Sequence, residues 1–397
     1  MKRKFAAIIA VLFLYLSMAS FTYAEPVRAD NSEAEKELAD NVNDIVDNLD
    51  LAELEAYLAT LSESQRAVIG TSGLKDRIKA VISGNLSDDY GSFLSYIASV
   101  LGVNIVNYLP IIVSVITIAV AYSLMSSLRG KFASDSVQNI VYFACVALLI
   151  VVLFTQIFSL IAAVRKTVTE LRNQMRITFP ILLTLMTAVG AGSSVAVYKP
   201  GVAILIGGIA ELITVFIIPA FIVSIVMTAV GNLSDGVKLG KLSGFFSNVS
   251  KWLLGTAFFV FTAFMAVQGI TASVYDGVSV RTAKFAISKY VPVIGGYLSD
   301  GLNLVISGSV LVKNAVGTTA IVLLFLSVIP TVVQILMLVL SLHFAGAVIE
   351  PLGDSRMSSL VSALAKNLTL LVSVVLAIAF LYFIFLLLII CTGNLAL

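Results

Sequence analysis

The feature that most constrains this fold is the succession of apolar runs between Leu101 and Leu397. The stretch 368–391 contains no charged residue, and about 20 mostly apolar residues in a helix cross the roughly 30 Å of bilayer hydrocarbon. Several such runs would cover a water-soluble domain with exposed apolar surface. The sequence therefore predicts an all-α, polytopic transmembrane helical bundle and argues against a soluble enzyme.

The apolar runs predict seven or eight spans within a multi-pass membrane domain, 101–397. Five are continuous: 107–128, 139–161, 252–274, 318–343 and 368–391. Two more, 177–198 and 202–231, are interrupted by glycine or proline. An eighth segment, 291–312, contains Gly295, Gly296 and Asp300. It could span the membrane, re-enter it or lie at its surface.

Charge divides the chain into two parts. Residues 25–100 contain 15 Asp and Glu but 6 Lys and Arg, whereas residues 101–397 contain 8 acids and 16 bases. Leu38, Val42, Ile45 and Leu49 recur at helical spacing in the acidic part. We expect 25–100 to be a small helical module that binds neither nucleic acid nor anionic lipid, because its net negative charge repels both.

The first 24 residues have the pattern of a signal peptide. Three basic residues, Lys2 to Lys4, precede an apolar stretch at 5–16, and Thr22-Tyr23-Ala24 places small residues at the cleavage positions. An uncleaved anchor is the alternative. Both place the acidic module outside the cytoplasm.

The positive-inside rule does not choose the side of the C-terminus. With eight spans, the internal and external loops would each carry eight Lys or Arg residues, and with seven spans the numbers become seven and nine.

Several residues are candidates for a path or an interface. Glu211 is a carboxylate within an apolar run, and such groups face a bundle interior or water because burying them in lipid is costly. A hydrogen bond to a neighbouring helix is the structural alternative. Pro219 and the break that contains Gly190 and Gly192 free backbone groups that a cavity or another helix must satisfy. Asp300 is a further candidate.

Gly269, Ser273 and Gly277 lie four residues apart and predict a small-residue face for close helix packing. They fit packing within one chain better than dimerisation.

Signals for catalysis, metal binding and cofactors are absent from the sequence. It contains no HExxH motif, Walker A loop or dinucleotide fingerprint. Its two cysteines, Cys145 and Cys391, and its single histidine, His343, lie far apart in apolar runs and form no ligand set. We therefore expect no catalytic residue, no metal and no cofactor.

Four blocks in the second half form a recognisable pattern. They are Val267-Gln268-Gly269 with Asp276-Gly277-Val278, Arg281-Thr282-Ala283-Lys284-Phe285, Pro292-Val293-Ile294-Gly295-Gly296 with Ser299-Asp300, and Leu311 to Gly317 with Pro351-Leu352-Gly353-Asp354. In this pattern the chain resembles the stage III sporulation protein AE family of endospore-forming bacteria.

The resemblance implies a place and a role. Members lie in the mother-cell membrane around the forespore, in a channel or feeding apparatus required for late forespore gene expression and integrity. Implied partners are the other membrane proteins, the ATPase and the ring proteins of the stage III operon, and indirectly stage II sporulation protein Q. The resemblance supplies no catalytic residue.

Two other functions remain open. A stand-alone secondary transporter would be favoured by an inverted repeat that links the broken segments to a later pair. An intramembrane enzyme would need a nucleophile and a base at one membrane depth, and the polar residues here are scattered.

Overall fold

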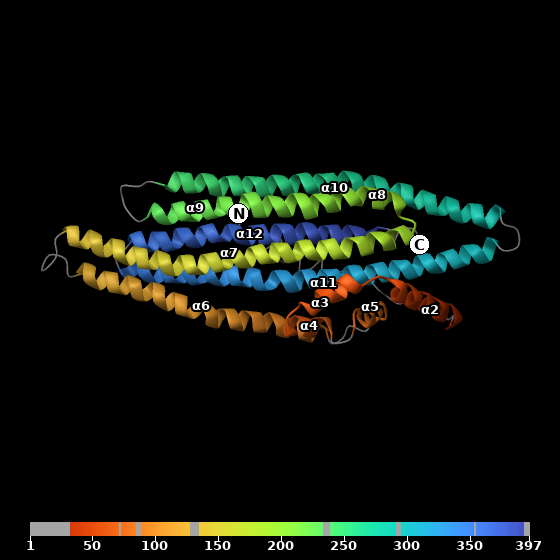
Figure 1. Ribbon diagram of the computed structural model, residues 1–397, viewed down its shortest axis with the longest axis horizontal. Helices are drawn as coiled ribbons and strands as arrows, with labels where there is room; N and C mark the ends of the chain where they lie inside the picture. Colours follow the sequence, from red (N-terminus) through yellow and green to blue (C-terminus); the bar gives the residue numbers. More distant parts are fainter. Residues whose placement is uncertain are drawn as a thin grey trace.

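The computed structural model describes residues 32–70, 73–84, 89–127, 135–232, 239–290, 295–352 and 355–392. The predicted signal peptide lies outside these residues. Every element within them is a helix, so the prediction of an all-α bundle is confirmed. Figure 1 shows long helices lying side by side along one axis, with short helices against one flank.

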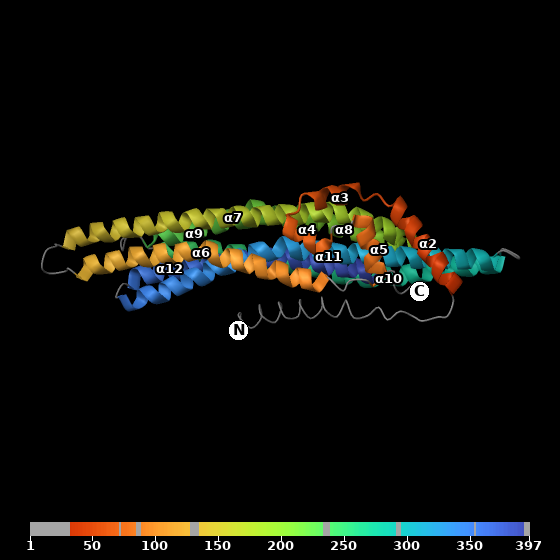
Figure 2. The ribbon, with the colours of Figure 1, turned by 90° about the horizontal axis from the view of Figure 1, so that it is seen from below.

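Four short helices form the N-terminal module: α2 (Ser32–Asn48), α3 (Ala52–Ala59), α4 (Glu63–Ile69) and α5 (Leu74–Ile82). A capping box starts α4, because the Ser62 and Gln65 side chains each bond the other's backbone amide. Val46, Leu54 and Ile78 are almost completely buried. The module packs on the bundle, with α2 and α5 against α11, α3 against α7 and α4 against α6; Figure 2 shows it along that flank.

The bundle consists of six membrane-length helical segments within the described ranges. They are α6 (Asp89–Ser127), α7 (Asp135–Ala188), the continuous segment α8 (Gly192–Ala203), η1 (Ile204–Ile209), η2 (Leu212–Ile217) and α9 (Ile218–Val230), then α10 (Gly240–Tyr290), α11 (Gly295–Ile349) and α12 (Ser355–Cys391). A short 3-10 turn, η3 (Glu350–Leu352), precedes α12. Consecutive segments run in opposite directions (Figure 1).

The helix boundaries differ from the predicted spans in three places. The predicted segment 291–312, from Gly295 onward, and the predicted span 318–343 form one helix, α11. Helix α7 contains the predicted span 139–161 and residues 177–188 of the next predicted span. The residues after the turn at Gly190 continue with 202–231 as one helical segment. The stretch 162–176 lies between two predicted spans because its basic residues interrupt the apolar run. In the structure it is helical, because Val164, Val168 and Leu171 recur on one buried face.

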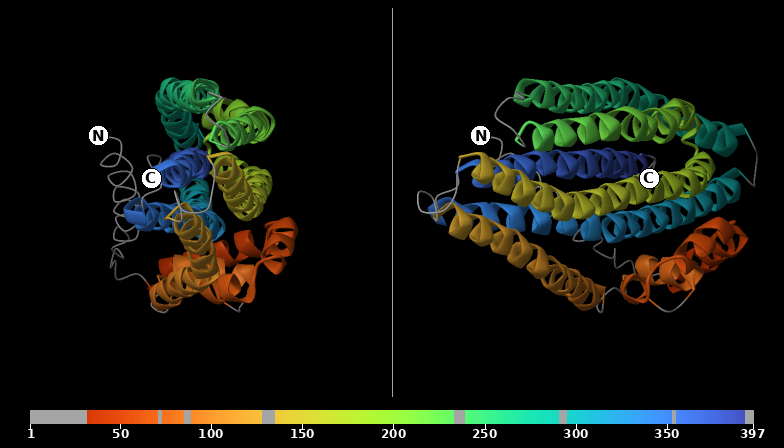
Figure 3. Two further views of the ribbon diagram at one scale, coloured as in Figure 1. Left: turned by 90° about the vertical axis from the view of Figure 1, so that its left-hand side faces the viewer. Right: turned by 60° about the vertical axis from the view of Figure 1, so that its left-hand side comes forward.

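The centre of the bundle is occupied by α12. Most of its side chains from Leu360 to Ile389 are buried. Helix α12 contacts α7, α9, α10 and α11, which lie next to it in the end view of Figure 3. Phe385 of α12 makes aromatic contacts with Phe179, Tyr198 and Phe261, which come from three different helices. The single-chain interior is therefore filled with side chains at this level.

The C-terminal end of α12 lies beside the turn between α7 and α8. The hydroxyl groups of Tyr198 and Thr392 are 2.8 Å apart. The C-terminal ends of α6, α9 and α11 lie at the opposite end of the bundle, on the left in Figure 1.

Candidate functional site

Glu211 lies on the bundle surface, where it pairs with a cation of the neighbouring helix. Arg172 Nη1 of α7 donates to Glu211 Oε2 at 3.2 Å, and the two side chains are 43% and 53% exposed. A charged residue in a membrane-length helix is thus satisfied by an interhelical ion pair rather than by a cavity within this chain. The hydrogen bond to a neighbouring helix that was considered as the alternative for Glu211 is present as part of this salt bridge.

The backbone around Glu211 is unusual because π-helix flanks it on both sides. The amides of Ala210 and Ile218 bond to the carbonyl oxygens of Leu205 and Ile213, five residues earlier. Thr214 Oγ1 donates to the carbonyl oxygens of Ala210 and Glu211, at 3.0 and 3.2 Å. Local π-helix interrupts the α-helical hydrogen-bond ladder and is frequent at functional sites.

Pro219 is the second residue of α9, which starts at Ile218 directly after the second π segment. Proline has no amide hydrogen and its ring clashes with a preceding carbonyl group in a regular α-helix. The wider π turn allows the helix to continue up to the proline. The predicted interruption of 202–231 is therefore a change of helix type rather than an end of the helix.

The predicted break at Gly190 is a tight helix-to-helix turn. Gly190 adopts φ 86°, and the amides of Gly190 and Ala191 bond to the carbonyl oxygens of Thr187 and Met186. These are the two hydrogen bonds of a Schellman motif, which requires the left-handed backbone that glycine adopts readily. Gly192 is the first residue of α8, with open space where a Cβ atom would lie.

Asp276 of α10 caps the helix that starts after this turn. Its two carboxylate oxygens accept hydrogen bonds from the amides of Ser193 and Ser194, at 2.8 and 3.0 Å. Asp276 is only 7% exposed. A carboxylate is well placed there, because the first amides of a helix lack intrahelical partners and carry the positive end of the helix dipole.

Lys313 makes the complementary contact at the nearby end of α12. Lys313 belongs to α11 and its side chain is completely buried. Its Nζ donates to the carbonyl oxygens of Ile390 and Thr392. A cation at a helix C-terminus satisfies carbonyl groups that have no intrahelical donor. Asp276 and Lys313 therefore tie two helix ends to α10 and α11 at one end of the bundle.

The remaining predicted residues are placed only by their helices. Asp300 lies in α11, and Gly269, Ser273 and Gly277 lie in α10. Their side-chain surroundings are outside the described part of the structure. The small-residue face stays a prediction.

A proline in α11 organises the contact with the N-terminal module. Pro330 lies within α11 and cannot donate to the carbonyl oxygen of Leu326 four residues earlier. That oxygen instead accepts from Tyr96 Oη of α6 at 2.9 Å and from Gln65 Nε2 of α4 at 3.0 Å. The gap in the helix ladder is thus filled by two side chains that hold neighbouring helices in place.

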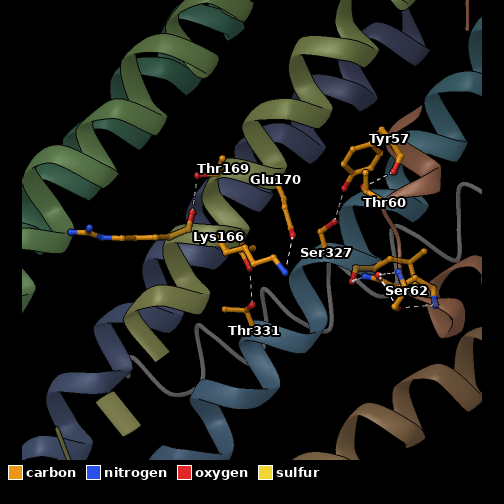
Figure 4. Close-up of polar contacts among 12 residues, drawn as sticks. Tyr57, Thr60, Ser62, Lys166, Thr169, Glu170, Ser327 and Thr331 are labelled. Carbon is orange, nitrogen blue, oxygen red and sulfur yellow. Dashed lines mark hydrogen bonds and ion pairs between the residues drawn. The ribbon is translucent and has the colours of Figure 1, made fainter. Parts of the chain in front are cut away.

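A second polar contact lies at the next residue of α11, Ser327, and joins α3, α7 and α11. Gln174 Nε2 is 2.6 Å from both Tyr57 Oη and Ser327 Oγ. Figure 4 shows Tyr57 and Ser327 directed toward each other, beside Lys166 and Glu170 of α7. Burial raises the pKa of the Tyr57 hydroxyl, so this group stays protonated at neutral pH.

We predict that the pair Tyr96→Phe and Gln65→Ala loosens the module without unfolding the bundle. Each substitution removes one hydrogen bond to Leu326, with a loss of about 1 kcal/mol per bond, and Gln65→Ala also removes the capping bond that Gln65 accepts from the Ser62 amide. Hydrogen exchange in α4 should accelerate. Adding Pro330→Ala restores an amide donor for Leu326, so the same double substitution should then have a smaller effect. An unchanged effect would contradict the role of the proline.

The sequence did not point to Asp276, Lys313 or Gln174 as site residues. Asp276 stands in a polar stretch that had no recognisable partner, and Lys313 marked an apparent gap between spans. Their partners are backbone groups distant in the sequence, which no local pattern identifies.

The described residues include no group of three or more His, Cys, Asp or Glu side chains able to hold a metal ion. The charged groups described above bind backbone termini or one another. These contacts hold the helices in position within the bundle.

Comparisons with known proteins give one consistent result. The sequence model of the family described as stage III sporulation protein AE matches residues 72–393. The chain is also 25% identical over 272 residues to stage III sporulation protein AE of Bacillus subtilis (strain 168), an alignment that covers 68% of each chain. No solved structure matches.

Proposed function

Because the chain belongs to the stage III sporulation protein AE family, we propose that it is an integral component of the channel or feeding apparatus between mother cell and forespore. In this role it supports late forespore gene expression and forespore integrity during endospore formation. The single observation that carries the proposal is the family match over the whole bundle and the end of the N-terminal module.

The proposed location is the mother-cell membrane around the forespore, with the N-terminal module outside the cytoplasm. Six apolar helical segments support a multi-pass protein. The predicted signal peptide supports export of the module, which packs firmly on α6, α7 and α11. Its acidic surface would then lie between the two membranes, where ring-forming partners reach it.

The filled centre of the bundle favours a role within an assembly. Leu153, Phe179 and Leu386 are fully buried inside one chain, so a conduit for solutes would run between chains rather than through this one. We therefore propose the other membrane proteins, the ATPase and the ring proteins of the operon as partners, with stage II sporulation protein Q reached through the rings.

Purification from sporulating cells in mild detergent tests the proposal. We expect the chain to elute with the other proteins of the stage III operon, identified by mass spectrometry. Isolation as a homo-oligomer without them, together with solute transport after reconstitution in liposomes, would identify a secondary transporter instead.

Glu211 gives a sharper test of function at one residue. The exposed ion pair with Arg172 contributes at most about 1 kcal/mol to stability, so Glu211→Gln and Glu211→Ala should leave thermal unfolding almost unchanged. If the π-flanked site serves the channel, both variants should lower spore yield at normal protein levels. Arg172→Ala is the matched control for loss of the pair. Normal spore yield in both Glu211 variants would remove this residue from the candidate site.

A further inference from the structure

The outer face of α7 changes character part-way along the helix. The large exposed side chains from 140 to 158 are all apolar: Ile140, Phe143, Leu148, Val151 and Phe158. Beyond them the exposed side chains are polar, charged or small: Ser159, Ala162, Arg165, Lys166, Thr169, Asn173, Arg176, Pro180, Thr184 and Thr187. The buried face stays mostly apolar along the whole helix, with Thr167, Gln174 and Thr178 as its polar members. The change is therefore much sharper on the outer face, which indicates a change in its surroundings.

The neighbouring antiparallel segment shows a similar change. From Gly192 to Glu211 its exposed positions are mostly small or polar, whereas beyond Glu211 they include Val215, Phe216 and Val230. The ion pair between Arg172 and Glu211 joins the two helices 13 residues beyond Ser159 and four residues before Val215. The two changes therefore lie in the same part of the bundle, about 14 Å apart along its axis.

Other helices continue the apolar surface around the bundle. On α10 the large exposed apolar side chains run from Leu242 to Val260, apart from Phe285 near the other end of the helix, and Thr262, Ala263 and Ala266 follow Val260. On α11 they include Leu336, Leu340 and Phe344, at the end of the helix farthest from the N-terminal module. We call the exposed apolar residues of α7, α9, α10 and α11 in this half the apolar girdle.

The girdle has the height of a bilayer interior. Residues 140–158 of α7 and 242–260 of α10 are each 19 residues long, which corresponds to about 28 Å of helix against about 30 Å of hydrocarbon. By contrast, the full α7 helix of 54 residues is about 80 Å long, far more than one bilayer can cover.

We propose that the lipid hydrocarbon surrounds only the half of the bundle that carries the apolar girdle. The other half, including α7 beyond Ser159 and the segment from Gly192 to Glu211, stands in the aqueous space that also contains the N-terminal module. Arg165 and Lys166 lie at the level of the phospholipid headgroups, where cations meet anionic lipid.

Charges within the embedded half are compatible with this placement. Lys366 precedes Asn367, whose side chain bonds to Thr228 near the end of α9, so this lysine lies near the opposite membrane surface. Lys251 of α10 lies at the middle of the stretch 242–260, about 13 Å from either end. It has an interaction partner within the chain, and charges at membrane depth are commonly paired in this way.

Single cysteines test the boundary in a chain with Cys145 and Cys391 replaced by serine. A membrane-impermeant maleimide should modify Asn173→Cys and Thr184→Cys on the same side of the membrane as Asn43→Cys in α2. Val151→Cys and Phe216→Cys should react at least about tenfold more slowly until detergent is added, because hydrocarbon excludes the reactive thiolate. Protection of Thr184→Cys to the level of Val151→Cys would overturn the proposal.

The only tryptophan of the chain provides a second measurement. In proteoliposomes containing brominated phospholipid, the fluorescence of Trp252 should be strongly quenched. A tryptophan at Thr184 in a Trp252→Phe background should keep most of its fluorescence. Equal quenching at both positions would place both halves in lipid. Neither experiment depends on the partners of the chain, so the proposed channel role can fail separately.

Discussion

Asp276→Ala is expected to destabilise the bundle by about 3 kcal/mol. The substitution leaves the amides of Ser193 and Ser194 without their acceptors, and each buried unsatisfied donor costs about 1–3 kcal/mol. It also removes a negative charge from the positive end of the α8 dipole. Unfolding of the purified protein in detergent, followed by near-ultraviolet circular dichroism, measures the loss.

Asp276→Asn is the matched variant. Its amide group has nearly the same shape but retains one oxygen acceptor, so we expect an intermediate loss. Glu55→Ala removes an exposed acid from α3 and serves as the control for charge alone. If Asp276→Ala were no more harmful than this control, water rather than Asp276 would satisfy the two amides.

Gly317→Leu is expected to have an effect of similar size through packing. A Cβ atom at Gly317 of α11 would lie 2.6 Å from Cγ1 and 2.8 Å from Cδ1 of Ile390 in α12. Overpacking a filled core typically costs about 1–3 kcal/mol and sometimes more. The larger leucine should separate α11 from α12 and weaken the nearby contact of Lys313 with Ile390. Thermal unfolding in detergent measures the loss.

Two companion variants make the packing explanation testable. Ile390→Ala provides space, so the double variant with Gly317→Leu should recover part of the lost stability. Gly301→Ala lies in the same helix with open space around the added carbon, and it should be neutral or stabilising by up to about 1 kcal/mol. Equal behaviour of Gly317→Leu and Gly301→Ala would contradict a close approach at Gly317.

Helix class followed from the sequence because apolar length is a local property. Long uncharged runs predict helices whatever their neighbours are. The break at Gly190 was predicted for the same reason, since glycine clusters interrupt helices locally, but it was predicted as an interruption within one span and not as the turn between two helices. The resemblance likewise rested on local blocks, and the family match confirms it.

Helix continuity was harder to predict, because it depends on partners. Lys313 lies between the predicted spans 291–312 and 318–343, because a lysine ends an apolar run. In the structure its ammonium group binds a carbonyl group of α12, and the helix continues through it. The bases around Arg172 suggested a loop, yet their helix buries its other face in the bundle.

The sequence by itself thus determined that this chain forms apolar helices, that one of its apolar runs is broken at Gly190, and to which family it belongs. Only the tertiary structure decided that charged stretches stay helical, that Glu211 pairs across the surface with Arg172, and that Asp276 and Lys313 hold helix ends. The physical reason is that solvation of a charge depends on the groups around it, and those groups are brought together from distant parts of the chain.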